Sequence, residues 1–214
     1  MVEEIHSLEE KYNKMYRTGY GKGTNHGLEY IDLITNKLKV KNILDVGCGR
    51  GYAVKEFIKR GYDCKGIEIS SWLFENDLRE LKEQDLVFHT SSKELPFEDN
   101  SFNLIFCTDV IEHIPEQDII SSINEMVRVS NKYLFFTIAK SKSDYELNGF
   151  NPHLTIKPRE WWIKIIEIEG NTKLISPNWF INFLLIREPR LSKFKFFRKR
   201  GYYLFKKNFT TVSL

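Results

Sequence analysis

The sequence predicts an α/β fold in which helices cover both faces of a seven-stranded, mostly parallel sheet. Short apolar runs alternate with amphipathic segments between residues 29 and 138, and each run has the length of a typical strand. A cluster of glycines follows the first apolar run, where the chain has to turn sharply from strand to helix. The 214 residues suffice for one well-cored domain.

The alternation predicts the order of the elements. Strands are expected at 41–46, 63–69, 86–90, 102–107 and 132–138, and two more between 173 and 186. Helices are expected at 29–38, 52–60, 71–82, 116–128 and 158–168. We expect the main domain to span 1–190, with 1–38 as an N-terminal lid segment. Residues 191–214 show no clear period and are expected to form a separate basic, aromatic tail.

Charge is distributed unevenly along the chain. The net charge is +3, but 187–207 holds nine basic residues and only one acid, Glu188. No apolar run has the length of a membrane span, and the charged N-terminus lacks the apolar stretch of a signal peptide. Cys48, Cys64 and Cys107 are too scattered for a disulfide framework or a zinc site. We therefore expect a cytoplasmic protein with reduced thiols.

The most informative motif is the glycine cluster after the first predicted strand. Gly47, Gly49 and Gly51 alternate with other residues, and a helix is predicted to begin directly after them. This arrangement lets the backbone approach a ligand closely and presents the N–H groups of a helix N-terminus. The spacing is GxGxG, whereas pyrophosphate-binding loops have GxGxxG. Asp45, two residues before Gly47, is placed to orient the loop and to hold an ammonium group.

A second acidic residue follows at the end of the second predicted strand. Glu68 lies 17 residues after Gly51, where a carboxylate can accept hydrogen bonds from both hydroxyls of a ribose. The same charge would repel a 2′-phosphate, which disfavours NADP. The glycine loop and Glu68 together indicate a nucleoside cofactor that carries an amino-acid end.

Four stretches extend this pattern: LDVGCGRGY, GIEIS, ELPFEDNSFNLIFCTDVIEHIP and MVRVSNKYLFFTI. They resemble the class I S-adenosylmethionine-dependent methyltransferases, in the small-molecule branch that includes ubiquinone-biosynthesis and sugar O-methyltransferases. The resemblance covers roughly residues 40–140 and implies a Rossmann-like fold. With the residues above, it gives a set of expected cofactor contacts: Asp45, Gly47, Cys48, Gly49, Gly51, Glu68, Ile69, Ser91, Ser92, Cys107 and Tyr20. Family members often carry Asp at the position of Ser91, so a hydroxyl there or the Ser92 backbone has to meet the adenine.

The fourth predicted strand ends beside a group of polar residues. Asp109, Glu112 and His113 are spaced i, i+3 and i+4, so they would share one face of a helical turn. Three roles stay open: packing beneath the loop, a base or its orienter, and ligation of Mg²⁺, as thought for related quinone methyltransferases. The Asn/Asp-Pro-Pro-aromatic tetrapeptide of amino-directed relatives is absent here, which argues against methylation of DNA bases or glutamine.

His153 lies in a loop after the fifth predicted strand, which commonly covers the substrate in this fold. An imidazole there can remove a hydroxyl proton as the methyl group arrives. His153, His113 and Asp109 are therefore the candidate catalytic residues. The glycine-rich segment 16–26 is either a lid, with Tyr20 touching cofactor or substrate, or a surface arm.

Three functions remain open at this point. The favoured one is O-methylation of a small polar acceptor, such as a sugar, a nucleotide-linked sugar or a phosphorylated metabolite. The alternative is an RNA or protein methyltransferase that uses the basic tail 193–207 and its aromatic residues. The third is a cofactor-binding subunit without activity of its own. The sequence does not predict an oligomeric state.

Overall fold

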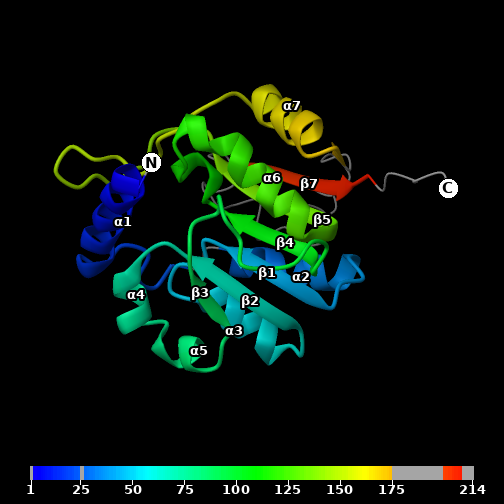
Figure 1. Ribbon diagram of the computed structural model, residues 1–214, viewed down its shortest axis with the longest axis horizontal. Helices are drawn as coiled ribbons and strands as arrows, with labels where there is room; N and C mark the ends of the chain where they lie inside the picture. The colour runs from blue at the N-terminus through cyan, green and yellow to red at the C-terminus, as the bar shows by residue number, and fades with distance from the viewer. Residues whose placement is uncertain (1, 25–26, 175–199, 209–214) are drawn as a thin grey trace.

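The computed structural model describes residues 2–24, 27–174 and 200–208. Its centre is a seven-stranded sheet in the order β3-β2-β1-β4-β5-β7-β6 (Figure 1). The strands β1 to β5 run parallel, and β7 runs antiparallel to both β5 and β6. The predicted fold class is confirmed.

The strands β1 to β6 follow the predicted apolar runs, whereas β7 lies where a tail was expected. Their bounds are β1 Asn42–Val46, β2 Asp63–Glu68, β3 Val87–His89, β4 Phe102–Thr108, β5 Ser130–Ala139, β6 Thr172–Leu174 and β7 Arg200–Lys207. In β1 and β4 nearly every side chain is buried, because helices pack on both faces of the sheet.

The helices form two layers around this sheet (Figure 1). The helices α2 (Leu28–Lys37) and α3 (Tyr52–Lys59) share a buried cluster with Ile43, Phe106 and Phe135 on one face. The helices α6 (Ile119–Val129) and α7 (Arg159–Glu169) share a second cluster with Leu44 and Ile105 on the other face. Short 3₁₀ turns at Ile111–His113 and Glu116–Asp118 precede α6. No helix among the described residues has both the length and the apolar character needed to cross a membrane.

The predicted helix 71–82 is instead two short helices, α4 (Ser71–Glu75) and α5 (Arg79–Glu83). Asn76 ends α4 with φ −125° and ψ −94°, and its side-chain amide donates to the Trp72 carbonyl. Asn side chains favour such local bonds over a continuous helix. The apolar period continued across this break, so the sequence pattern did not reveal it.

An additional helix, α1 (Val2–Arg17), precedes the predicted elements. It lies at one end of the sheet beside α4. Tyr12, Met15 and Tyr16 are buried on its inner side. The N-terminal segment therefore begins with a docked helix, and the glycine-rich turn follows it.

The expected boundary at residue 190 does not hold for the last described strand. Residues of β7, which we expected in a separate tail, pair along most of β5, from Tyr133↔Lys206 to Ala139↔Arg200. Tyr203 and Phe205 are buried in the core. The second of the two strands expected within 173–186 falls in 175–199, outside the described residues, as does most of the expected tail.

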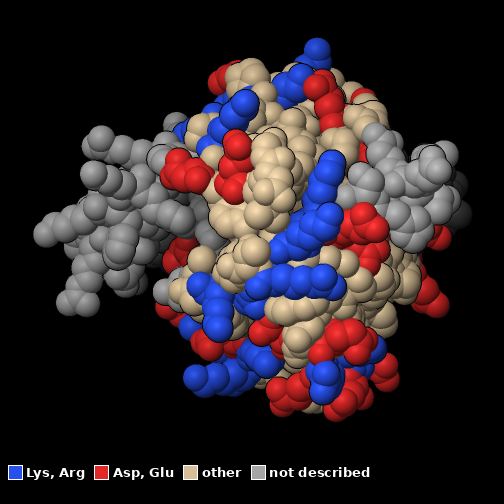
Figure 2. Space-filling model, turned by 90° about the vertical axis from the view of Figure 1, so that its left-hand side faces the viewer, with Lys and Arg blue, Asp and Glu red and all other residues tan. Residues whose placement is uncertain are grey.

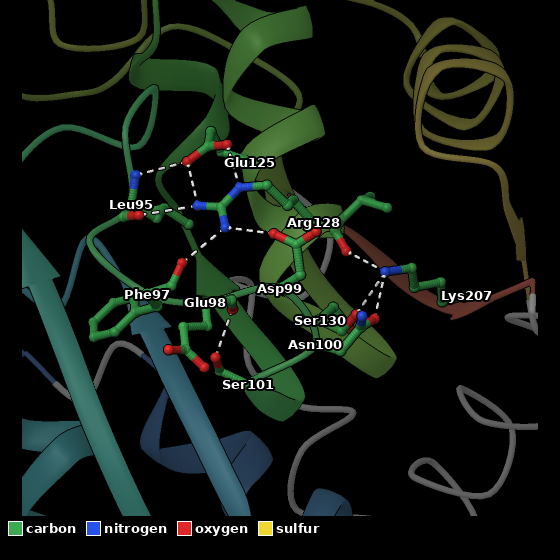
Figure 3. A network of polar contacts seen from close by, with 11 residues as sticks. Leu95, Phe97, Glu98, Asp99, Asn100, Ser101, Glu125, Arg128, Ser130 and Lys207 are labelled. Carbon is green, nitrogen blue, oxygen red and sulfur yellow. Dashed lines mark hydrogen bonds and ion pairs between the residues drawn. The ribbon is translucent and has the colours of Figure 1, made fainter.

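The loop before β4 is fixed by a polar network on the side of the sheet that carries α6 (Figure 3). Arg128 donates to the carbonyls of Leu95 and Phe97 and pairs with Asp99 and Glu125. The Lys207 ammonium group donates to the Val127 and Ser130 carbonyls and to the Asn100 side chain. The loop and β7 are thus tied to the end of α6.

Candidate functional site

A cavity of about 480 Å³ opens at the carboxyl ends of the parallel strands. Its lining comes from the loops after β1, β2, β3, β4 and β5 and from α1. In open α/β sheets, ligands bind at this edge because the strand order reverses there. The volume is typical of a small-molecule site.

The glycine loop forms the floor of this cavity. Gly47 has φ +72°, and a Cβ built there would lie 2.5 Å from Cγ2 of Val110. Gly49 has φ +51° and lines the cavity, and a Cβ there would be 3.5 Å from the Tyr16 hydroxyl. A side chain at either position would be strained. At Gly47 it would collide with Val110, and at Gly49 it would enter the cavity.

Glu68 ties the glycine loop to the start of α4. Its Oε2 accepts from the Gly49 N–H at 2.9 Å, and its Oε1 accepts from the N–H groups of Ile69 and Ser70 at 3.0 Å each. Burial raises the pKa of Glu68, while these three hydrogen bonds oppose the rise. The carboxylate therefore shapes the loop and also lines the cavity.

Asp45 lies at the end of β1 beneath the glycine loop and is 3% exposed. Burial, assisted by the nearby Glu68 charge, raises the pKa of Asp45 to about 8. The two carboxylates face the same cavity. A cationic ligand group bound between them would stabilise the charged form of both.

Other expected cofactor residues are spread along the lining. Ile69, Ser91, Ser92, Cys48 and Tyr20 all line the cavity. The Ser91 hydroxyl accepts from Lys93 N–H, and the Ser92 hydroxyl donates to Ser122. The two serines thus line the cavity after β3, with their hydroxyls engaged in local bonds.

Two expected contacts lie outside the lining. Gly51 begins α3 with φ +74°, and a Cβ there would lie 2.7 Å from the Leu81 side chain. Glycine at this position allows the positive φ of the turn and leaves room for α5 to pack against it. Cys107 is fully buried in the apolar cluster under α6. The strand end that faces the cavity is the next residue, Thr108.

Asp109 lies outside the helical turn that carries Glu112 and His113. Asp109 has φ +56°, and its carboxylate accepts from the Thr137 hydroxyl at 3.0 Å. The helical turn includes only Ile111–His113, so Asp109 does not share a helical face with them. Asp109 still lines the cavity from the end of β4.

The structure instead brings together Glu112, His113 and His153, whose potential ligand atoms all lie within 4.8 Å of one another. The Glu112 Oε1 accepts from the Ala139 N–H at 2.8 Å. The two rings meet edge to face with centroids 4.9 Å apart. Two imidazoles with one carboxylate do not suit Mg²⁺, which prefers oxygen ligands in an octahedron. We therefore derive no step through magnesium.

Hydrogen bonds fix both the ring of His153 and the backbone that follows it. Its Nδ1 lies 2.6 Å from the Ser141 carbonyl. A carbonyl oxygen only accepts, so Nδ1 carries the proton and Nε2 is the basic nitrogen of the neutral ring. The N–H groups of Leu154 and Thr155 both donate to the Glu112 carbonyl, at 2.8 and 2.9 Å. Glu112 thereby positions His153 beside His113.

The helix α1 extends the wall of the cavity beyond the expected segment 16–26, to Leu8 and Tyr12, which the sequence did not single out. Leu8, Tyr12, Tyr16 and Tyr20 line the cavity from this segment. The three tyrosines are spaced four residues apart, which is the spacing of one helix face. That period could have shown that the wall begins before residue 16.

Figure 2 shows the face that carries α1, with Lys and Arg side chains in a band across its middle. The exposed basic residues described in α1 and the turn after it are Lys11, Lys14, Arg17 and Lys22. Lys142, also exposed, lines the mouth of the cavity from the segment after β5. Positive charge on this face favours the encounter with anionic small molecules.

Comparison with known proteins agrees with this geometry. A family model described as a methyltransferase domain matches residues 44–135. The ubiquinone biosynthesis O-methyltransferase of Acinetobacter baylyi is 28% identical over 125 residues, which cover 55% of this chain and 52% of that protein. The protein of the same name from Histophilus somni is 29% identical over 123 residues, or 53% and 52% of the two chains. The chain thus spans about half the length of these curated relatives.

Solved structures show the same fold. An S-adenosylmethionine-dependent methyltransferase from Clostridium acetobutylicum aligns with a TM-score of 0.61 and 14% identity, over 95% of this chain and 99% of that one. The [4+2]-cyclase SpnF aligns with a TM-score of 0.57 and 17% identity, over 84% and 80%. Because a cyclase shares the fold, activity has to be argued from the site. The chain is therefore similar to methyltransferases over residues 44–135, and its architecture is the fold of the solved methyltransferase.

Proposed function

We propose that the chain transfers a methyl group from S-adenosylmethionine to an oxygen of a small polar acceptor. The acceptor would bind in the cavity between α1 and the segment 141–153. The observation that carries this proposal is the position of His153, whose side chain lines the same cavity as the glycine loop and Glu68. Its Nδ1 contact with Ser141 leaves Nε2 as the nitrogen that accepts a proton.

The residues present fit this cofactor. The positive φ angles of Gly47 and Gly49 leave a surface without side chains for its methionine part. Asp45 and Glu68 are buried carboxylates beside that surface, suited to an ammonium group and to ribose hydroxyls. Ile69, Ser91 and Ser92 line the part of the cavity nearest β3, where the base would lie.

The chain's own residues prepare the acceptor. When bound, S-adenosylmethionine supplies an electrophilic methyl group on a sulfonium. His153 Nε2 would take the proton of the acceptor hydroxyl while the acceptor oxygen attacks in line. His113 packs edge to face against His153, and Tyr12 holds its Nδ1 at 2.6 Å. Ser141 and Glu112 keep the His153 ring and its loop in place.

Aromatic side chains limit the access of water to the reacting groups. The rings of Tyr20 and Tyr145 have centroids 4.9 Å apart, and the Tyr145 hydroxyl lies 2.7 Å from that of Thr18. This contact joins α1 to the segment after β5 across the cavity. A drier site favours attack on a sulfonium, because a nucleophile with fewer waters reacts more readily.

Lys142 offers a contact for a phosphorylated acceptor, although the exposed Asp144 lines the cavity beside it. Lys142 lines the mouth and is exposed, whereas Lys93 is paired with Asp118 at 3.0 Å. The RNA-directed alternative loses support, because Tyr203 and Phe205 of the expected aromatic tail are buried in the sheet. Stacking on bases requires exposed rings.

The test is a transfer assay with tritiated S-adenosylmethionine. The acceptor panel comprises sugars, sugar phosphates, nucleotide sugars and catechols, with an RNA pool and a peptide pool as the macromolecular arm. Labelling of a small hydroxyl compound is expected, and labelling of only RNA or peptide would overturn the proposal. With the acceptor in hand, His153→Gln should lower kcat by about 10²–10⁴-fold. His113→Gln should cost less.

A further inference from the structure

Arg50 occupies the last variable position of the GxGxG loop, yet its side chain points away from the loop into α1. The residue is 7% exposed. Its Nη2 donates to the Tyr16 carbonyl at 3.0 Å and to the Tyr20 carbonyl at 2.9 Å, and its Nε donates to the Tyr20 carbonyl at 3.1 Å. Its Nη1 pairs with Asp77. A buried guanidinium with this set of acceptors is held in one orientation.

The carbonyls that Arg50 binds lie at the C-terminal end of α1. Helix ends leave backbone carbonyls without intrahelical partners, and the helix dipole places partial negative charge there. Gly19 N–H reaches the Tyr16 carbonyl at 3.1 Å, and Arg50 supplies the second donor. The guanidinium also lies over the Tyr16 ring, 5.5 Å from its centroid. Arg50 is thus a cap that the cofactor loop contributes to α1.

The capped end of α1 carries the part of the wall nearest the glycine loop. Tyr16 and Tyr20 line the cavity, and the Tyr16 hydroxyl faces the position where a Cβ of Gly49 would lie. Tyr20 contacts Tyr145 of the acceptor side. Through Arg50, the loop that cradles the cofactor therefore also sets the position of the tyrosines that face the acceptor.

The middle of α1 is attached independently of Arg50. The Asn13 side chain accepts from the Trp72 N–H at 3.0 Å and from the Ser70 hydroxyl at 2.6 Å. These contacts join α1 to the start of α4. Loss of Arg50 should therefore release the segment after Tyr16 and leave the rest of α1 docked.

We propose that Arg50 is a positioning residue that couples cofactor binding in the glycine loop to closure of the segment 16–24 over the acceptor. The role of that closure rests on the proposed function, since it presumes an acceptor between α1 and the segment 141–153. An ordered glycine loop fixes Arg50, and Arg50 then fixes the two carbonyls. An empty, more mobile loop would let the same segment open and admit the acceptor.

Hydrogen exchange followed by mass spectrometry tests this coupling with S-adenosylhomocysteine as the probe. In the wild-type chain, the probe should slow amide exchange in 16–24 by at least about tenfold, because three charge-assisted hydrogen bonds hold this segment. In Arg50→Met the probe should still bind, but the slowing in 16–24 should fall below about twofold. Exchange in β4 and β5 should respond to the probe as in the wild type. Arg60→Met is the matched control, since Arg60 pairs with Asp32 and Glu56 away from the cavity.

Arg50→Lys keeps the positive charge beside Asp77 but lacks the planar fork that reaches both carbonyls. The Lys variant should therefore also lose the probe-dependent slowing of exchange in 16–24. It replaces the Met variant as the test if the Met variant does not fold or does not bind the probe. Full probe-dependent protection of 16–24 in the Lys variant would overturn the proposal. The exchange experiment uses no acceptor. Failure of the O-methyltransferase proposal in the acceptor panel can therefore be told apart from failure of the coupling.

Discussion

The hydroxyl of Tyr12 lies 2.6 Å from Nδ1 of His113, although the two residues stand 101 positions apart in the chain. Burial raises the pKa of Tyr12 well above its usual value, so the hydroxyl stays protonated at neutral pH. The N-terminal helix therefore reaches across the cavity and holds one of the two imidazoles beside the expected transfer position.

Replacing Tyr12 with Phe removes this contact and keeps the ring. We expect kcat to fall about 5- to 30-fold, the equivalent of one lost hydrogen bond of 1–2 kcal/mol. The dissociation constant for S-adenosylhomocysteine should change little. Steady-state kinetics and calorimetry on the same samples separate the two effects. Tyr62→Phe is the control, because Tyr62 packs on Phe57 outside the cavity lining. Equal kinetics for the two variants would contradict a role for the hydroxyl.

Glu68→Gln should weaken binding of S-adenosylhomocysteine by about 30- to 1000-fold, from a loss of 2–4 kcal/mol in charge-assisted hydrogen bonds. The amide can donate as well as accept, so one of the three N–H contacts from Gly49, Ile69 and Ser70 is also disturbed. Calorimetric titration measures the change. Glu80→Gln, at an exposed ion pair with Lys55, should bind like the wild type. An unaltered affinity in Glu68→Gln would show that this carboxylate does not hold the ribose.

The raised pKa of Asp45, about 8, predicts a pH-dependent stability of the ligand-free protein. Between the ordinary Asp value near 4 and pH 8, the folded chain keeps a proton that the unfolded chain has released. The contribution of Asp45 is therefore fully present at low pH and is lost as the pH rises toward 8. From pH 6 to 8 the loss is at most about 3 kcal/mol. Thermal unfolding should show a larger drop in Tm for the wild type than for Asp45→Asn, and parallel curves would refute the assignment.

Arg128→Ala should destabilise the fold by about 2–4 kcal/mol, because the Leu95 and Phe97 carbonyls and two carboxylates lose a donor together. Arg60→Ala is the matched control, because the side chains of Arg128 and Arg60 are similarly exposed, at 31% and 32%. The Arg60 guanidinium pairs with the Asp32 and Glu56 carboxylates, so its loss should cost under about 1 kcal/mol. Urea unfolding distinguishes the two variants, and equal midpoints would show that the network contributes no more than surface pairs do.

Excess chelator should leave the transferase rate unchanged. Glu112, His113 and His153 form a donor set unsuited to Mg²⁺, and the groups already bond to Ala139, Tyr12 and Ser141. The assay compares rates with and without EDTA, followed by addition of Mg²⁺ or Zn²⁺. Loss of activity that zinc restores would revive a metal role for these three residues.

The sequence predicted the parts of the fold that depend on local pattern. The strands β1 to β5 lie within a few residues of the expected runs, because each contains a short apolar stretch that is buried in the sheet. The glycine loop and Glu68 were recognisable because a ligand that approaches the backbone demands particular residues at particular spacings.

The remaining features depend on contacts between distant segments. The break at Asn76 interrupts an apolar period that itself continues. The meeting of His153 with His113 depends on the Glu112 carbonyl, which binds the backbone after His153. The strand β7 carries Arg and Lys among its aromatic residues, and only its pairing with β5 shows which side chains are buried.

The position of β7 has a consequence for synthesis of the protein. The last described strand lies between β5 and β6, so the centre of this half of the sheet is synthesised after both of the strands that flank it. Until residues 200–207 emerge, β5 presents an unpaired edge with a row of buried-type side chains, a template for pairing with other chains. A nascent chain halted before this strand would be a substrate for chaperones, and premature termination there should yield aggregates and no shortened, active enzyme.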